Sequence, residues 1–259
     1  MMKKIIVANW KMNPATLQEA KQLFNSIKKS IKNIKNTEVV ICPPFVYLPN
    51  IKSQISNIKL GSQDCFWENS STNRGAFTGE ISPSMLKNLG CQYVILGHSE
   101  RKQHIGETDE MINKKVEVVL KNNLRAILCV GETKKEREAG QTKKVLKKQL
   151  EKCLKKIIGL SNRQLANLII AYEPIWAIGP GGPCSVSEAL ENILFLKKII
   201  ARNFNQKIGK NISIIYGGSI TSQNAFDFLK EKEINGVLVG SASLKADEFA
   251  SITKQAQKI

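Results

Sequence analysis

Several polar residues that can do acid–base chemistry follow closely on apolar runs of the sequence. Lys11 follows the first such run, His98 the fourth and Glu173 the sixth. A carboxylate can abstract a proton, a neutral imidazole can polarise a carbonyl, and an ammonium group offsets developing negative charge. Glu173 lies between Tyr172 and Pro174, and partly apolar surroundings strengthen a carboxylate as a base. These residue types favour proton abstraction next to a carbonyl, through an enediolate.

Glycine-rich turns follow the last two apolar runs. Gly217 and Gly218 follow the seventh run, and Gly240 follows the eighth. Backbone N–H groups at helix starts bind anions, and the loops after the last two strands of a barrel commonly hold phosphate. Turns use glycine for other reasons too, so the evidence lies in two adjacent loops rather than in one Gly-Gly pair. The sequence therefore predicts a small phosphorylated substrate and a phosphosugar isomerase.

Other chemistries have little support in the sequence. It has no nucleotide-binding fingerprint and no Ser/His/Asp arrangement. Its six cysteines form no Cys-x-x-Cys pair, and His98 and His104 are the only histidines, so we expect no metal and no cofactor. Cys42 and Cys129 lie in apolar runs and are predicted to be buried.

Eight short apolar runs must position these groups. The runs cover residues 5–8, 39–42, 58–61, 93–96, 126–130, 168–171, 212–216 and 237–239. Continuous apolar runs are typical of parallel strands that are buried on both faces. Helix starts are predicted between them at Ser82, Ser185 and Thr221. Eight strand–helix units without a linker predict an α/β fold, a single (β/α)₈ barrel domain over residues 1–259.

Two of the intervening segments show helical periodicity in their apolar residues. The first has Leu17, Ala20, Phe24, Ile27 and Ile31. The second has Leu190, Ile193, Leu194, Leu196 and Ile200. We expect both sets to face the core.

The chain carries 39 Lys+Arg against 22 Asp+Glu, a formal net charge of +17. Such a charge can indicate a polyanionic partner. The densest group of lysines is Lys143, Lys144, Lys147, Lys148, Lys152, Lys155 and Lys156. They alternate with a predicted apolar helix face of Val145, Leu146, Leu150, Leu154, Ile157 and Ile158. Because no aromatic residue lies among them to stack on bases, we predict a solvated helix surface and no nucleic-acid partner.

No apolar run approaches the roughly 18 residues of a membrane span, and the apolar run near the start is too short for a signal peptide. We therefore expect a cytoplasmic protein with reduced thiols and no membrane partner.

Seven motifs along essentially the whole chain resemble those of the triosephosphate isomerase family. They are 9–13 (NWKMN), 75–80 (GAFTGE), 97–101 (GHSER), 129–132 (CVGE), 171–179 (AYEPIWAIG), 216–220 (YGGSI) and 240–244 (GSASL). The resemblance implies a TIM barrel. It also implies a cofactor-free interconversion of dihydroxyacetone phosphate and D-glyceraldehyde 3-phosphate.

The resemblance assigns a role to each matching residue. Glu173 would carry the proton between two carbons, neutral His98 would stabilise charge on the substrate oxygens, and Lys11 would bind substrate and balance the enediolate. Asn9 would lie beside Lys11, and Ser99 would precede the helix that assists His98. Other supporting residues would be Glu100 and Trp176, and the phosphate would be held by the amides of Gly179, Ser219, Gly240 and Ser241.

The resemblance also implies a homodimer and a mobile lid. The loop at 75–80 would dock into a neighbouring subunit through Phe77, Thr78 and Glu80, with Thr78 near the partner's site. The segment from Pro174 onward would close over the substrate and exclude water.

Three departures from the family pattern are visible. The lid reads Gly-Pro-Gly-Gly-Pro-Cys over 179–184 where the family has Gly-Thr-Gly-Lys-Thr/Val-Ala, which alters the hinge and predicts changed closure kinetics with intact chemistry. Ser241 replaces a glycine, and residues 68–74 carry an insertion.

Two alternative functions remain open. Another barrel phosphosugar isomerase would use a pair of acidic groups, which does not account for Lys11, His98 and Glu173. A basic barrel that binds nucleic acid or a surface would show steeply salt-dependent binding.

Overall fold

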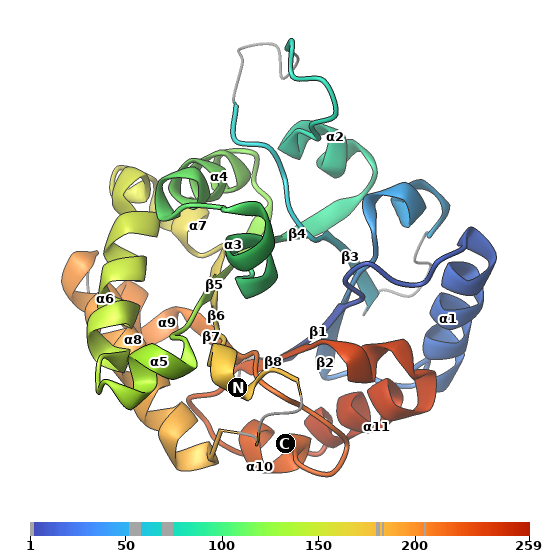
Figure 1. The fold of residues 1–259 in the computed structure, drawn as a ribbon. Coiled ribbons are helices and arrows are strands. Elements are labelled where there is room, and N and C mark those ends of the chain that lie inside the picture. Colours follow the sequence, from blue (N-terminus) through green and yellow to red (C-terminus); the bar gives the residue numbers. More distant parts are fainter. Residues whose placement is uncertain (1–2, 52–57, 69–74, 180–181, 183, 205) are drawn as a thin grey trace.

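Eight parallel strands form a closed barrel, seen end-on in Figure 1. The computed structural model describes residues 3–51, 58–68, 75–179, 182, 184–204 and 206–259. The strands are β1 (Lys4–Asn9), β2 (Thr37–Cys42), β3 (Ile58–Ser62), β4 (Cys91–Leu96), β5 (Arg125–Val130), β6 (Leu168–Tyr172), β7 (Ser213–Tyr216) and β8 (Gly236–Val239). Each strand pairs with the next along the chain, and β8 pairs with β1. The predicted (β/α)₈ TIM barrel is confirmed, while its extent as one domain over 1–259 stays a prediction.

Helices surround the strands in Figure 1. The α-helices are α1 (Leu17–Ser30), α2 (Pro83–Asn88), α3 (Ser99–Ile105), α4 (Asp109–Lys121), α5 (Lys134–Glu138), α6 (Thr142–Cys153), α7 (Asn162–Leu165), α8 (Val186–Asn203), α9 (Gln206–Asn211), α10 (Ala225–Leu229) and α11 (Ala246–Ala256). Short 3₁₀ helices are η1 (Phe45–Asn50), η2 (Lys155–Ile157), η3 (Ile175–Ala177) and η4 (Ser241–Leu244). Because every connection returns to the same end of the barrel, all strand carboxyl ends share one rim.

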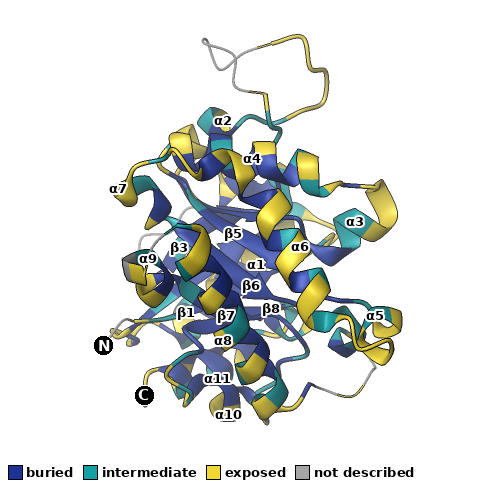
Figure 2. Ribbon diagram, turned by 90° about the vertical axis from the view of Figure 1, so that its left-hand side faces the viewer, coloured by how far each residue is buried: buried dark blue, intermediate teal, exposed yellow. Residues whose placement is uncertain are grey.

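Alternate side chains of each strand enter two different apolar layers. Ile5 and Val7 of β1 pack inside the barrel, whereas Ile6 and Ala8 pack outward against the helices. Strand side chains point alternately to opposite faces, and both faces are covered here, as the dark blue strands of Figure 2 show. This explains why all eight predicted strands read as continuous apolar runs.

The helix predictions succeed on the core face and fail at its edges. Ala20, Phe24 and Ile27 are buried as predicted. Leu194 is 47% exposed because it lies one residue beyond Ile193 and therefore about 100° away around the helix. Ile158 is 63% exposed because it follows the last turn of the helical segment that was expected to bury it.

The predicted helix starts are confirmed at two positions and wrong at one. Ser82 and Ser185 are N-caps, each accepting a hydrogen bond from a first-turn amide. Thr221 does not begin a helix, because α10 starts only at Ala225. A turn comes first, in which Asn224 Oδ1 accepts the Thr221 N–H at 2.9 Å.

The predicted exposure of the lysines and burial of the cysteines are confirmed, while the absence of a nucleic-acid partner stays a prediction. The seven lysines at 143–156 are exposed, and several form surface ion pairs, such as Lys143 with Glu191 at 2.5 Å. The six cysteines are all free and buried. In the described part of the chain, no helix has the length and apolarity needed to span a membrane.

Gly236 provides a test of how tightly the barrel closes. A Cβ at this position would lie 1.8 Å from the carbonyl oxygen of Ile5 on the neighbouring strand. Gly236→Ala should therefore destabilise the fold by about 3 kcal/mol, measured by urea unfolding. Gly159→Ala is the matched control, because its Cβ would meet no described atom within 4 Å. Equal stability of the two variants would contradict the tight closure.

Candidate active site

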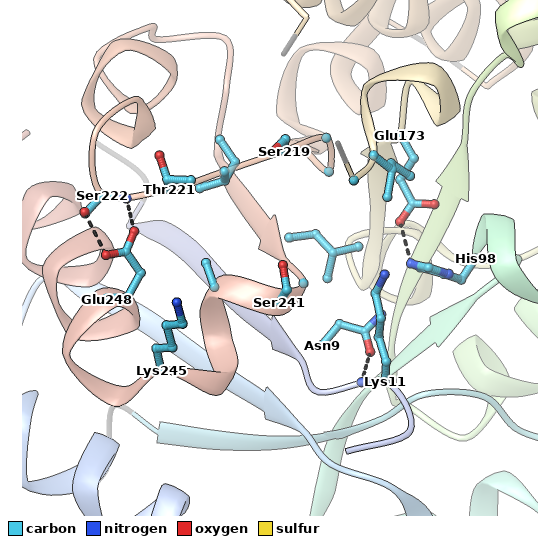
Figure 3. A pocket seen from close by; sticks show the side chains of 18 of the residues that line it. Asn9, Lys11, His98, Glu173, Ser219, Thr221, Ser222, Ser241, Lys245 and Glu248 are labelled. Carbon is cyan, nitrogen blue, oxygen red and sulfur yellow. Dashed lines mark hydrogen bonds and ion pairs between the residues drawn. The ribbon is translucent and has the colours of Figure 1, made fainter. Parts of the chain in front are cut away.

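The predicted catalytic and substrate-binding residues line one cavity of about 500 Å³ at the carboxyl ends of the strands. Figure 3 shows His98 and Glu173 facing each other at one side, with Lys11 beside them. The cavity is lined by Asn9, Lys11, His98, Glu173, Gly179, Ser219, Gly240 and Ser241, among others. Residues from the ends of β1, β4, β6, β7 and β8 are thus brought together.

Lys11 is held in place from several sides. The side-chain Nζ of Lys11 lies 2.5 Å from Glu100 Oε1, and the backbone N–H of Lys11 donates to Asn9 Oδ1 at 3.0 Å. The Gln63 amide donates to the Lys11 carbonyl at 2.8 Å. Lys11 also has φ +54°, a left-handed conformation that costs a residue other than glycine about 1 kcal/mol or more. A Cβ on Gly240 would lie 3.3 Å from Lys11 Cε, so this glycine leaves room for the ammonium chain.

His98 caps the amino end of α3, which begins at Ser99 itself rather than after it. Its Nδ1 accepts the Glu100 N–H at 3.2 Å, whereas the nearer carboxylate oxygen of Glu100 is 3.6 Å away. A nitrogen that accepts a hydrogen bond carries no proton, so the neutral ring holds its proton on Nε2. His98 therefore presents an N–H donor to the cavity.

Glu173 is buried at 2% exposure with its carboxylate turned towards His98. Oε2 accepts the Ser99 N–H at 3.4 Å, and Oε1 lies 3.5 Å from His98 Nε2. Two glycines make room for it: a Cβ on Gly131 would lie 1.7 Å from the Glu173 carbonyl, and one on Gly217 would lie 2.8 Å from its Cγ. Oε1 forms no hydrogen bond with any described residue, so it is available to accept a proton.

The predicted phosphate loops are ordered by contacts that sequence reasoning did not include. The Ser219 N–H, a predicted phosphate donor, is already donated to the Ala177 carbonyl at 3.0 Å. Beyond it, Glu248 accepts the N–H and the hydroxyl of Ser222 at 2.6 and 2.9 Å, as Figure 3 shows. The Ser219 N–H is therefore free to donate to a phosphate only after its bond to Ala177 breaks.

Trp176 lies beside the cavity, not in it, and anchors the start of the predicted lid. Its Nε1 donates to Glu132 at 2.7 Å, and the Tyr172 hydroxyl donates to the same carboxylate at 3.2 Å. Burial raises the pKa of Glu132. Sequence reasoning missed this role for Glu132, although the residue ends a quoted motif directly after β5.

The predicted hinge of the lid is only partly visible. Gly179 has φ +87°, which favours glycine. Pro180, Gly181 and Pro183 lie outside the described residues.

Neither cysteine near the site is a nucleophile. Burial raises the pKa of Cys184 to about 12. It also raises the pKa of Cys129, which lies beside the Glu173 carboxylate. Since the thiolate is the reactive form, both side chains act as small apolar groups at neutral pH.

A buried charge cluster fixes α3 from behind. Lys115 is 2% exposed and contacts both Asp64, at 2.7 Å, and Glu107. Arg101 of α3 pairs with Asp64 at 2.7 Å. Burial raises the pKa of Asp64 to about 6 despite these cations, so the carboxylate is still charged at neutral pH. Sequence reasoning missed the cluster, because its members come from different units of the barrel.

The predicted docking loop is exposed. Residues 75–80 are all exposed, and Phe77 packs only partly, with its ring 4.8 Å from that of Phe66. In Figure 1 the described part of this segment, between β3 and α2, projects away from the barrel. Of the insertion at 68–74, residues 69–74 lie outside the described part.

The chain is similar to known proteins along nearly its whole length. The family model described as Triosephosphate isomerase matches residues 4–256. A triosephosphate isomerase of Alkaliphilus oremlandii is 46% identical over 254 residues, 97% of this chain and 99% of that protein. One of Aquifex aeolicus is 45% identical over 253 residues, 97% and 98% of the two chains. One of Dehalococcoides mccartyi is 46% identical over 261 residues, 100% and 98%. These relatives do not favour the two alternative functions.

Replacing Lys115 tests the buried cluster. Lys115→Met leaves the buried carboxylates of Asp64 and Glu107 with Arg101 as their remaining cationic partner. The variant should therefore be less stable by about 3 to 5 kcal/mol at pH 7.5. The ammonium lowers the pKa of Asp64, so its loss raises that pKa further. Asp64 of the variant should therefore take up a proton above pH 6, so the stability deficit should narrow as the pH falls towards about 6 and level off below it.

The matched control is Lys121→Met, which breaks only the exposed pair with Glu117 on α4. It should cost about 0.5 kcal/mol or less in the same unfolding experiment. A similar small cost for Lys115→Met would show that the cluster does not stabilise α3.

Proposed function

Because the chain belongs to the triosephosphate isomerase family and is therefore an isomerase of dihydroxyacetone phosphate and D-glyceraldehyde 3-phosphate, we propose that three residues carry its chemistry. Glu173 is the base, His98 the neutral electrophile and Lys11 the cation. The observation that supports this most is their convergence on one cavity. Every proposed step uses only groups of this chain.

Glu173 moves the proton. Its free Oε1 takes a proton from the carbon next to the substrate carbonyl, and the same carboxylate returns it to the neighbouring carbon. Between these two transfers the substrate is an enediolate, and its hydroxyl proton passes from one oxygen to the other, so that carbonyl and hydroxyl exchange places. The Ser99 N–H holds the other oxygen at 3.4 Å, and because Gly217 has no Cβ beside the Glu173 side chain, the carboxylate has room to turn towards the substrate.

His98 and Lys11 stabilise the charge that develops on the substrate oxygens. The His98 Nε2–H donates to them as a neutral imidazole, a role already established for triosephosphate isomerase. Lys11 supplies a positive charge that Glu100 orients and partly offsets at 2.5 Å. Asn9 fixes the Lys11 backbone through its Oδ1.

Phosphate binding is coupled to the lid. The phosphate is held by the amides of Gly179, Ser219, Gly240 and Ser241. To reach Ser219 it must displace the Ala177 carbonyl, which belongs to η3 at the start of the lid. Binding thereby releases one end of the segment from Pro174 onward. Closure then excludes water from the enediolate, as is established for this family.

A homodimer completes the proposal. The loops that follow β1, β2 and β3 expose apolar side chains, with Met12 93%, Val46 72% and Phe77 42% exposed. Apolar side chains that gather on neighbouring loops are typical of a covered surface. A second copy of the chain covers them, with Thr78 and Glu80 of the docking loop reaching towards its active site.

We place the protein in the cytoplasm. All six cysteines are free, as is usual where the surroundings are reducing.

The role of Glu173 is tested by Glu173→Asp. Shortening the side chain withdraws the carboxylate by about 1 Å and should lower kcat roughly a hundredfold with little change in KM. Glu191→Asp, on an exposed glutamate of α8, is the control and should keep full turnover. Unchanged turnover in Glu173→Asp, in a coupled assay with glyceraldehyde 3-phosphate, would remove Glu173 from its role.

The dimer is tested by Phe77→Asp. Burying an unpaired carboxylate in the interface weakens the free energy of association by about 3 kcal/mol. The dissociation constant of the dimer, measured by sedimentation velocity, should therefore rise roughly a hundredfold. Ile158→Asp, at another exposed apolar residue outside these loops, should leave the dimer intact. A wild-type chain that sediments as a monomer at all concentrations would contradict the proposal.

A further inference from the structure

A second cavity, of about 460 Å³, opens between the ends of α1 and α11. Since α1 leads into the start of β2, this cavity lies at the amino ends of the strands. In Figure 2 the carboxyl end of the chain, just after α11, lies on the left, while α3 and α5, which follow the strand carboxyl ends, lie on the right. The cavity is therefore on the opposite face of the barrel from the active site.

Four lysines line this cavity, and none of its lining residues is acidic. The lysines are Lys29, Lys32, Lys254 and Lys258, and the other lining residues are Ser30, Asn33, Ile34 and Gln257. All four lysines are exposed. Within the described chain, none of them pairs with a carboxylate within 4.0 Å. Four like charges thus surround one hollow, and none of them is paired with a carboxylate of the described chain.

The ends of the two helices do not account for so much charge. A helix carboxyl end carries about half an elementary negative charge, so α1 and α11 together present about one. Four lysines leave a surplus of roughly three positive charges. The lysines of α6 behave differently, because Lys143 pairs with Glu191 at 2.5 Å and Lys152 with Glu110 at 2.9 Å.

We propose that this cavity, which we call the lysine pocket, binds an oligophosphate such as a triphosphate group, either free or carried by a nucleotide. A chain of phosphates spreads several negative charges over a short length, which suits four separate ammonium groups with three donors each. The side-chain amides of Asn33 and Gln257 can donate to phosphate oxygens or to a base. A nucleic-acid strand fits less well, because no aromatic ring lines the pocket to stack on bases.

The lysine pocket is separate from the proposed catalysis. Its residues touch none of the groups around Glu173, and the phosphate loops open on the other rim. An oligophosphate bound here leaves the substrate site free. Binding and isomerase activity can therefore be measured independently.

The test is calorimetric titration of the whole protein with tripolyphosphate at low and physiological salt. The pocket variant carries Lys29→Gln, Lys32→Gln, Lys254→Gln and Lys258→Gln. The matched control removes the same charge from exposed helix surface, with Lys144→Gln, Lys147→Gln, Lys148→Gln and Lys155→Gln. All eight lysines are exposed, so both variants should fold and keep wild-type kcat and KM.

We expect one tripolyphosphate site per chain, weakened at least about tenfold in the pocket variant and hardly changed in the control. Affinity should fall as salt rises. Any competitive inhibition of the isomerase by tripolyphosphate reports binding at the active site and should persist in the pocket variant.

Equal affinity of the two variants, or no binding at low salt, would overturn the proposal, whereas a loss of isomerase activity would speak only to the proposed function. Titration with ATP identifies the source of the phosphates. Affinity equal to that of tripolyphosphate assigns the pocket to the phosphate chain alone. Tighter binding of ATP, with adenosine inactive, assigns it to a nucleotide.

Discussion

The first turn of α3 contacts all three proposed catalytic side chains, and the site depends on this one segment. The Glu100 N–H fixes the proton position on His98, the Glu100 carboxylate holds Lys11, and the Ser99 N–H holds Glu173. A helix amino end has free N–H groups and a positive potential, which suits a carboxylate and a neutral imidazole. The ion pair between half-buried Arg101 and buried Asp64 ties the same turn to the barrel.

The closed parallel barrel brings the rest of the chain to that turn. Lys11, His98 and Glu173 lie far apart in the sequence, but they follow β1, β4 and β6 at the same rim. The lysine pocket lies at the other rim. The two ends of one barrel thus carry the two proposed anion sites, with backbone amides at one end and lysine ammonium groups at the other.

Much of this was predictable from the sequence, for physical reasons that differ between residues. The strands were predictable because burial on both faces makes them continuously apolar, and the first apolar helix face because its period matches 3.6 residues. The helix start predicted at Thr221 was wrong, because a threonine in a turn and a threonine that caps a helix have the same local sequence signal. The predictions that Leu194 and Ile158 lie on a buried helix face were wrong, because the sequence pattern alone does not locate the edge of that face.

The sequence by itself determined which groups follow each strand, and therefore which side chains meet at the rim. Strand and helix periods are local properties, and the direction of parallel strands follows from their connections. Only the tertiary structure decided what those groups contact. The ion pairs of Lys115, the bond between Ala177 and Ser219, and the meeting of α1 with α11 join residues from different units of the barrel. Such contacts depend on distances in the folded chain, which no local pattern encodes.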